Sequence, residues 1–243
     1  TRRDRFQLTP AERIAVRLGR DAFTRDRTLT LASIEAGTEA LRQARRRLDD
    51  LGVAHYRAVA TSAVRESRNG AAFIEAVRRE TGIHLETISG SEEARLVWLA
   101  VRHRMALGED RWILADLGGG SVEVSVVDRE VILWSESHTL GTVRLLQGFQ
   151  ENGMEATDDL GELLSRYAHV LKLPRAVAEW APRGMIATGG NIEALAGLAR
   201  APRGEDGVAV LEVEALREML GRLVPLDEAA RMERFGLRAD RAD

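Results

Sequence analysis

Apolar positions recur at two spacings along this chain, every three to four residues and every second residue. The first spacing is typical of a helix that packs one face on a core, and the second is typical of a strand. Gly82 is a candidate helix terminator, Asn69 is a candidate N-cap, and a serine opens the helix that begins at residue 91. In the first half the pattern predicts helices over residues 30–51, 69–82 and 91–105, and strands over 15–19, 55–61 and 84–89.

In the second half the alternation comes first, and short turns between the runs favour an antiparallel meander. The pattern predicts strands over 111–117, 121–127, 130–138 and 184–190, and helices over 142–150, 157–172, 211–222 and 226–235, with one more directly after residue 190. The break near residues 106–110 separates the two halves. We therefore expect an α/β fold of two lobes with a cleft between them, residues 1–106 in the first and 107–243 in the second.

Composition narrows the classes of function. The formal net charge is −3 over 243 residues, so no general basic field indicates nucleic acid as a partner. No cysteine is present, which excludes disulfides and thiolate metal sites, and the five histidines lie too far apart for a metal-ligand spacing. No signal-peptide core opens the chain, and no apolar run approaches the roughly 20 residues of a membrane helix. We expect a cytoplasmic protein without a membrane partner.

The segment DLGGGSVE, residues 116–123, places three glycines between two predicted strands. Their N–H groups are able to form an anion cradle, to which Ser121 adds a hydroxyl. Asp116 and Glu123 flank the loop, and hard cations such as Mg²⁺ prefer oxygen ligands of this kind. A phosphate with a divalent cation suits this pattern. A plain tight hairpin turn explains it as well.

Three further segments have both a functional and a structural interpretation. The paired glycines of TGG, residues 188–190, form a second phosphate turn or an ordinary strand-to-helix turn. Glu92 and Glu93 either act in chemistry or complement the dipole of the helix that they open. Arg65 lies in the polar segment 60–69, which is a binding loop or a plain connection.

Six short segments stand out along the chain. In order, they are VRLG (16–19), ATSAVRESRN (60–69), ISGSEEARLVWLAV (88–101), DLGGGSVEV (116–124), LGTVRL (140–145) and TGGN (188–191). In this order and spacing the chain resembles the exopolyphosphatase and guanosine pentaphosphate phosphohydrolase family of the actin, chaperone-ATPase and sugar-kinase superfamily. The resemblance implies two ribonuclease-H-like lobes, of the actin-like ATPase type, with an interlobe cleft. It also implies Mg²⁺-assisted removal of the terminal phosphate from polyphosphate or guanosine pentaphosphate, and hence a link to the stringent response.

The resemblance also assigns roles to residues. Glu93 matches the catalytic base, and Asp116 and Glu123 match the acidic pair around the Mg²⁺ and the attacking water. The matched substrate-binding positions are Arg65, Gly118, Gly119, Gly120, Ser121, Gly189 and Gly190. Arg65, Arg68, Arg78, Arg79 and Arg144 are candidates for a basic channel, or for a solvated surface.

Two points leave the function open. No segment matches the Asp-x-Gly-Ser-Asn-Ser loop with which the family begins, and relatives continue into further helices. We therefore expect a chain without the first phosphate-loop strand and the C-terminal helices. A homodimer is an expected assembly. The alternative functions are a non-catalytic sensor of alarmone or polyphosphate on the same fold, and a phosphotransferase or ATPase of the wider superfamily.

Overall fold

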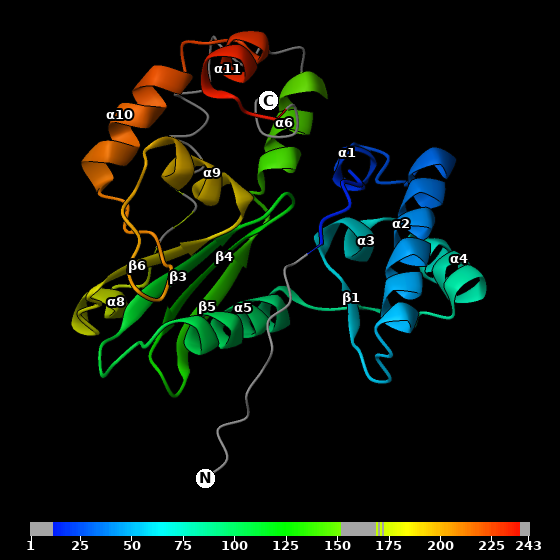
Figure 1. Cartoon of the computed structure of the whole chain (residues 1–243), viewed down its shortest axis with the longest axis horizontal. Helices are drawn as coiled ribbons and strands as arrows, with labels where there is room; N and C mark the ends of the chain where they lie inside the picture. The colour runs from blue at the N-terminus through cyan, green and yellow to red at the C-terminus, as the bar shows by residue number, and fades with distance from the viewer. Residues whose placement is uncertain (1–11, 152–168, 170, 172, 239–243) are drawn as a thin grey trace.

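The computed structural model describes residues 12–151, 169, 171 and 173–238, so the predicted helix 157–172 falls almost wholly outside the described residues. Figure 1 shows two lobes side by side. The N-terminal lobe contains α1 (Gly19–Ala22), α2 (Leu31–Asp50), β1 (Ala58–Ala60), α3 (Ser62–Glu66), α4 (Gly70–Thr81) and β2 (Leu85–Thr87). The second part contains α5 (Gly90–Arg104), β3 (Trp112–Leu117), β4 (Val122–Val127), β5 (Ile132–His138), α6 (Thr142–Glu151), α8 (Ala176–Glu179), β6 (Gly184–Thr188), α9 (Gly190–Leu198), α10 (Val213–Leu223) and α11 (Glu228–Phe235).

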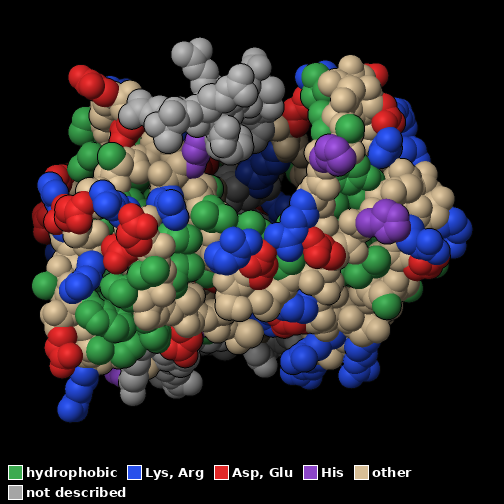
Figure 2. Space-filling view, turned by 90° about the horizontal axis from the view of Figure 1, so that it is seen from below, with side chains coloured by type: hydrophobic (Ala, Val, Ile, Leu, Met, Phe, Trp, Pro, Cys, Tyr) green, Lys and Arg blue, Asp and Glu red, His purple; other side chains and the backbone are tan. Residues whose placement is uncertain are grey.

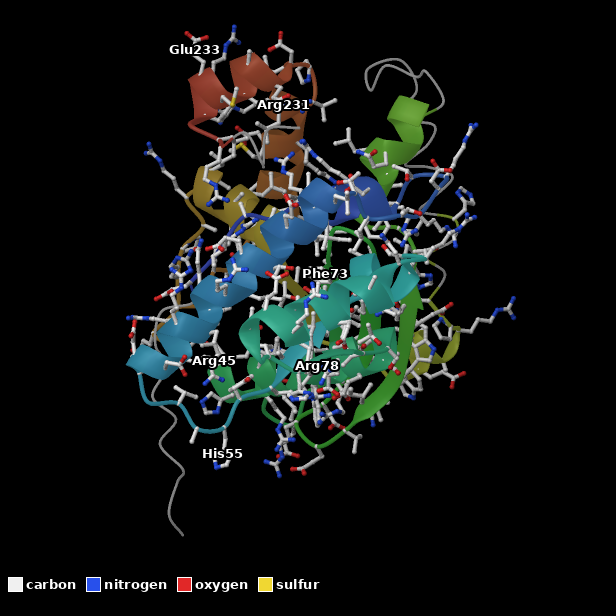
Figure 3. All side chains as sticks on the ribbon, turned by 90° about the vertical axis from the view of Figure 1, so that its right-hand side faces the viewer. Arg45, His55, Phe73, Arg78, Arg231 and Glu233 are labelled. Atoms are coloured by element: carbon white, nitrogen blue, oxygen red, sulfur yellow. The ribbon has the colours of Figure 1, made fainter. Side chains whose placement is uncertain are left out.

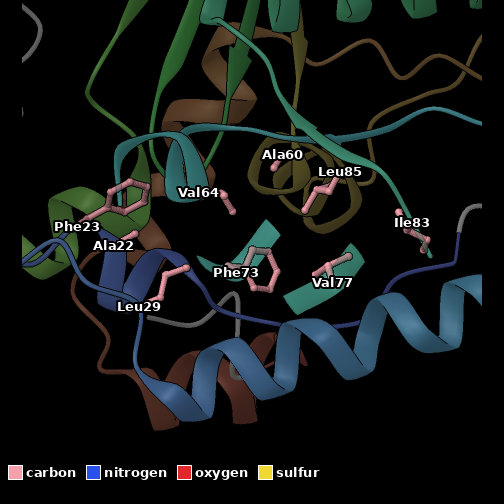
Figure 4. Close-up of a cluster of buried hydrophobic side chains, with 9 residues drawn as sticks. All are labelled: Ala22, Phe23, Leu29, Ala60, Val64, Phe73, Val77, Ile83 and Leu85. Carbon is pink, nitrogen blue, oxygen red and sulfur yellow. The ribbon is translucent and has the colours of Figure 1, made fainter. Parts of the chain in front are cut away.

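The N-terminal lobe is built around a cluster of buried apolar side chains between α2, α4 and the parallel pair β1–β2 (Figure 4). Phe73 is buried where α4 meets α2, and Gly37 of α2 makes room for it. A Cβ at residue 37 would lie 2.8 Å from the Phe73 ring. Thr30 caps α2 through its side chain, and Gly82 ends α4 with a left-handed φ of 69°. The predicted helices 30–51 and 69–82 are confirmed.

One local prediction in this lobe is wrong, and another is right in position only. Residues 15–19 pair with no described strand, because the apolar Leu18 packs against the N-terminal core and the chain then turns directly into α1. Asn69 is the N-cap residue of α4, as predicted, but its side chain makes no cap hydrogen bond to the helix. Its amide instead clamps the backbone of Leu29, accepting from the N–H at 2.9 Å and donating to the carbonyl at 2.8 Å. The short helices α1, α3 and α8 were not predicted, because one turn has no periodicity to detect.

The second sheet has the order β5-β4-β3-β6. The predicted meander is confirmed, since β3, β4 and β5 pair antiparallel, and β6 adds to β3 in parallel. Every residue of β4 is buried, because side chains cover both faces of the sheet. On one face, Trp98 and Val101 of α5 pack against Leu114 and Val127. Although α5 precedes residue 106, it packs on this sheet; the division at 106/107 stays a prediction.

The predicted helix 91–105 corresponds to α5, but its cap is Ser89, whose hydroxyl accepts from the N–H of Glu92 at 3.2 Å. The helices after β6 and near residues 211–222 and 226–235 are confirmed as α9, α10 and α11. No helix in the described part of the chain combines the length and the apolar character that a membrane crossing needs.

Candidate active site

A row of polar side chains crosses the second sheet at one level. The strand registers place Thr188 opposite Asp116, Asp116 opposite Glu123, and Glu123 opposite Ser137. Directly opposed residues project from the same face of a sheet, so one face carries four polar groups in a line. Thr188 donates to Asp116 Oδ1 at 2.5 Å, and Ser137 donates to Glu123 Oε1 at 2.8 Å. The two outer hydroxyls therefore orient the two central carboxylates.

The first turn of α5 lies against this row. A Cβ on Gly90 would overlap the Ser137 side chain and would lie 3.6 Å from Glu123 Oε1, so only glycine permits this approach. Glu93 follows one helical turn later. The close approach at Gly90 thus brings a third carboxylate, from a helix, to the pair on the strands.

The environment of Glu93 favours its neutral form. Burial, first, and the charge of Glu123, second, raise the pKa of Glu93 to about 7, although Arg65 opposes the shift. Arg65 Nη1 lies 4.0 Å from Glu93 Oε2, beyond hydrogen-bonding distance, and donates instead to the carbonyl of Ile88 at 2.5 Å. Oε2 of Glu93 is buried and accepts no hydrogen bond. A carboxylate with a pKa near 7 is suited to accept a proton at neutral pH.

Glu123 is buried more deeply, with 2% of its surface exposed. Burial raises the pKa of this carboxyl, as does the nearby Asp116, while the hydrogen bond from Ser137 opposes the shift. Its Oε2 is also buried without a hydrogen-bond partner. A buried, unpartnered carboxylate oxygen is costly unless something else satisfies it.

Glu93 and Glu123 each have a buried carboxylate oxygen without a hydrogen-bond partner, and a divalent cation is one group that would satisfy such oxygens. Among the described residues no group of three or more His, Cys, Asp or Glu side chains forms a ready-made metal site. Mg²⁺ does not need one, because it is usually held by one or two carboxylates together with waters and substrate phosphates. Asp116 and Glu123, opposed across β3 and β4, supply that donor set. The residues present fit Mg²⁺.

The glycine loop is held by the start of α6. The carbonyl of Gly118 accepts from the N–H of Thr142 at 3.1 Å, and the carbonyl of Gly119 accepts from the N–H groups of Val143 and Arg144 at 2.9 and 3.0 Å. A trans peptide points its carbonyl and its N–H in opposite directions. The N–H groups of Gly119 and Gly120 are therefore directed away from α6, as an anion cradle requires. Ser121 is buried, and its side chain acts on the Glu123 carboxyl, where it opposes the rise in pKa.

The paired glycines lie beside the same edge of the sheet. Gly189 has a φ of 108°, and a Cβ there would lie 2.6 Å from the carbonyl oxygen of Leu117. Gly190 is the first residue of α9. Since β3 and β6 are parallel, their carboxyl ends meet at one edge, and this edge carries Asp116, the glycine loop and the N-terminus of α9.

The five candidate arginines do not form one channel. Arg65 faces Glu93, and Arg144 binds the glycine loop. Arg78 projects from α4 on the outer side of its lobe (Figure 3), where it pairs with Glu75 at 3.0 Å. Arg79, Arg68 and Arg78 are all exposed, as expected for a solvated surface.

The surface between the lobes is hollowed, with basic side chains inside the hollow (Figure 2). Two other surface pockets, of about 450 Å³ beside Met105 and about 490 Å³ beside Tyr56, contain none of Glu93, Asp116 and Glu123. The acidic cluster and the glycine loop thus form a site distinct from these pockets.

Three residues that shape the site received no role from the sequence, namely Gly90, Ser137 and Thr188, although Gly90 and Thr188 lie within segments quoted above. Ser137 and Thr188 could be found only from the strand register, which shows which residues lie opposite Glu123 and Asp116. Hairpin lengths in the sequence suggest a register, but the observed strand pairing determines it. Gly90 lies within the quoted segment 88–101, but its contact with Ser137 depends on how α5 packs on the sheet, which the sequence does not show.

Comparison with known proteins places the chain in a family. Residues 2–243 match the Ppx/GppA phosphatase family. Exopolyphosphatase 1 of Mycobacterium tuberculosis is 32% identical over 197 residues, covering 79% of this chain and 57% of that protein. An uncharacterized protein of Streptomyces coelicolor is 31% identical over 216 residues, covering 86% and 64%. The chain thus spans about three fifths of the length of these relatives.

Solved structures agree in fold. The crystal structure of an exopolyphosphatase from Cytophaga hutchinsonii aligns with a TM-score of 0.88 at 26% identity, covering 100% of this chain and 80% of that one. The Aquifex aeolicus member of the family aligns with a TM-score of 0.69 at 25% identity, covering 93% and 73%. The expected actin-like ATPase fold of two α/β lobes is confirmed, and the chain belongs to the Ppx/GppA phosphatase family.

Proposed function

We propose that this protein hydrolyses inorganic polyphosphate from its end and releases the terminal phosphate. The observation that carries the proposal is the set of three carboxylates, Glu93, Asp116 and Glu123, beside a glycine loop in which the N–H groups of Gly119 and Gly120 are directed away from α6. Membership of a phosphatase family, and relatives that are named exopolyphosphatases, support the choice of substrate.

The step that we propose balances as follows. The Glu93 carboxylate takes a proton from a water molecule, whose oxygen forms a bond to the terminal phosphorus. The bond between that phosphorus and the bridging oxygen breaks, and the shortened chain leaves with the bridging oxygen and its electron pair. The N–H groups of Gly119 and Gly120 bind the terminal phosphate. Arg65 lies beside Glu93, and its positive charge would stabilise the bound anionic substrate.

Mg²⁺ is the cofactor in this proposal, and Asp116 and Glu123 would hold it. When bound, it neutralises phosphate charge and polarises the phosphoryl group. Neighbouring side chains orient these two candidate ligands. Thr188 orients Asp116 and Ser137 orients Glu123, while the burial of Glu123 keeps bulk water away from one of its oxygens.

Phosphate release tests the proposal. The protein is assayed with polyphosphate and with guanosine pentaphosphate, with and without Mg²⁺, because the family name covers both activities. The matched pair of variants is Glu93→Gln and Glu92→Gln, which remove neighbouring charges from one helical turn. Mg²⁺-dependent release that Glu93→Gln abolishes and Glu92→Gln retains supports the proposal. Tight binding without turnover would leave a sensor on this fold instead.

A further inference from the structure

The last peptide of the glycine loop is oriented by a side chain rather than by the helix backbone. The carbonyls of Gly118 and Gly119 accept from backbone N–H groups of α6, whereas the carbonyl of Gly120 accepts from Nε of Arg144 at 2.8 Å. Because carbonyl and N–H of one peptide point in opposite directions, this bond also sets the direction of the Ser121 N–H. We propose that Arg144 is a positioning residue for the phosphate loop and couples that loop to the other lobe. This inference rests on the proposed function.

The same guanidinium reaches the N-terminal lobe. Nη2 of Arg144 donates to both carboxylate oxygens of Glu66, at 2.9 and 2.8 Å. The two side chains are 19% and 21% exposed, so the pair is largely shielded from water. Glu66 ends α3 and directly follows Arg65, the residue that faces Glu93. One ion pair therefore connects the loop to the helix that carries the other candidate phosphate ligand.

Packing holds the contact in place. The Arg144 guanidinium lies 4.2 Å from the centroid of the Phe23 ring, within cation–π distance. A Cβ on Gly120 would overlap both Phe23 and Ser62, so the loop is pressed directly against the N-terminal lobe. Arg144 thus contacts the glycine loop, α3 and the end of α1 at once.

A phosphate bound between the lobes would meet the loop N–H groups on one side and Arg65 on the other. Loss of the Arg144 donors would let the Gly120–Ser121 peptide rotate. It would also let the distance between the loop N–H groups and Arg65 vary. Binding would weaken, while proton transfer to Glu93, on the neighbouring helix, would change little. The expected signature is a rise in KM with kcat nearly preserved.

The test uses Arg144→Met, which keeps an aliphatic stem over Phe23 and removes every donor. We expect KM for polyphosphate, and the Kd for tripolyphosphate by calorimetry, to rise about tenfold, with kcat within about threefold of the wild type. Arg217→Met is the matched control, because Arg217 is 74% exposed and pairs only weakly with Glu214, at 3.4 Å. An unchanged KM and Kd in Arg144→Met would overturn the proposal.

Glu66→Gln separates positioning from direct contact. If Arg144 acts through its tie to α3, loss of the Glu66 charge loosens the loop and weakens tripolyphosphate binding, by about threefold. If Arg144 instead binds phosphate itself, Glu66→Gln removes a competing carboxylate and strengthens binding, which contradicts the proposal. The variant must melt within a few degrees of the wild type for this comparison to count.

Two outcomes separate this inference from the proposed function. A wild-type protein that binds tripolyphosphate but hydrolyses no polyphosphate refutes the hydrolase, and the binding titrations still decide the role of Arg144. A wild-type protein that hydrolyses polyphosphate, with Arg144→Met equal to it, refutes the positioning role alone. Should Arg144→Met fail to fold, Arg144→Lys replaces it, since one ammonium cannot reproduce the geometry of the guanidinium; a wild-type Kd there overturns the proposal.

Discussion

The two sides of the first turn of α5 carry neighbouring glutamates in opposite electrostatic settings. Their side chains keep similar exposed fractions, 26% for Glu92 and 19% for Glu93. Hydrogen bonds from Arg95 and Arg57 lower the pKa of Glu92 to about 2. Burial and the charge of Glu123 raise the pKa of Glu93 to about 7. The sequence pattern EE therefore produces one permanently charged surface group and one group that is poised to exchange a proton.

The comparison teaches that the exposed fraction of a whole side chain does not by itself decide its chemistry, because burial of the carboxyl group is the first cause of the raised pKa of Glu93, whereas hydrogen bonds are the first cause of the lowered pKa of Glu92. Glu92 has two guanidinium partners at hydrogen-bonding distance, 2.6 Å from Arg95 and 2.8 Å from Arg57. Glu93 has one guanidinium at 4.0 Å and a carboxylate oxygen without any hydrogen bond. Carboxyl burial and hydrogen-bond partners, both set by which way each residue faces on the helix, distinguish the structural acid from the reactive one.

Removing the reactive acid should have the largest effect. We expect Glu93→Gln to lower kcat for polyphosphate about a thousandfold, since general-base catalysis contributes roughly 10²–10⁴ in rate. KM should change little, because Glu93 is not among the groups expected to bind phosphate. Initial rates of phosphate release measure both. A Glu93→Gln enzyme that retains more than a tenth of the wild-type kcat would exclude Glu93 as the base.

Asp116→Asn should have the next largest effect. The substitution keeps the shape and the contact with Thr188 but removes one of the two opposed charges that would hold Mg²⁺. We expect the Mg²⁺ concentration for half-maximal activity to rise by roughly 10- to 100-fold. Titration of Mn²⁺ by electron paramagnetic resonance gives a readout independent of turnover. Equal metal affinity in the variant would argue against Asp116 as a ligand.

The pH profile tests the pKa of Glu93 more finely. A base must be deprotonated to act, so at low Mg²⁺ the rate should fall about tenfold per pH unit below about pH 7. The negative charges of Glu123 and Asp116 contribute to this raised pKa. A divalent cation beside them opposes that contribution, so higher Mg²⁺ should move the acid limb to lower pH. A limb that stays fixed at all Mg²⁺ concentrations would place the cation elsewhere.

Much of the framework follows from the sequence. The helices α2, α4 and α5 and the strands β3–β5 have periodicities long enough to be detected, and Gly82 is placed correctly. The predicted strand 15–19 was wrong because alternation over a few residues does not show whether a partner strand is present. The pairing of Asp116 with Thr188, and of Arg144 with Glu66, joins residues about 70 to 80 positions apart. No local pattern encodes such contacts, since they depend on how the packed elements meet.

The smallest expected effect concerns stability, where the two glutamates should act with opposite signs. For Glu93 the pKa is raised from 4.5, so the folded state binds more protons than the unfolded chain between about pH 4.5 and pH 7, and stability is lost as pH rises through that range. At pH 8 the ionised Glu93 destabilises the fold, and Glu93→Gln should raise Tm by a few degrees. The gain should shrink toward zero as the pH falls to about 4.5.

For Glu92 the pKa is lowered from 4.5, so its contribution is present above that value and is lost as pH falls through about 2. Glu92→Gln should therefore lower Tm slightly at pH 8, because the exposed ion pairs with Arg57 and Arg95 are individually weak. Thermal melts of both variants and the wild type, at pH 8 and near pH 5, test the pair of signs together. If both variants lower Tm at pH 8, Glu93 is a stabilising ion-pair partner of Arg65, and the contrast between the two glutamates that supports its role as a base disappears.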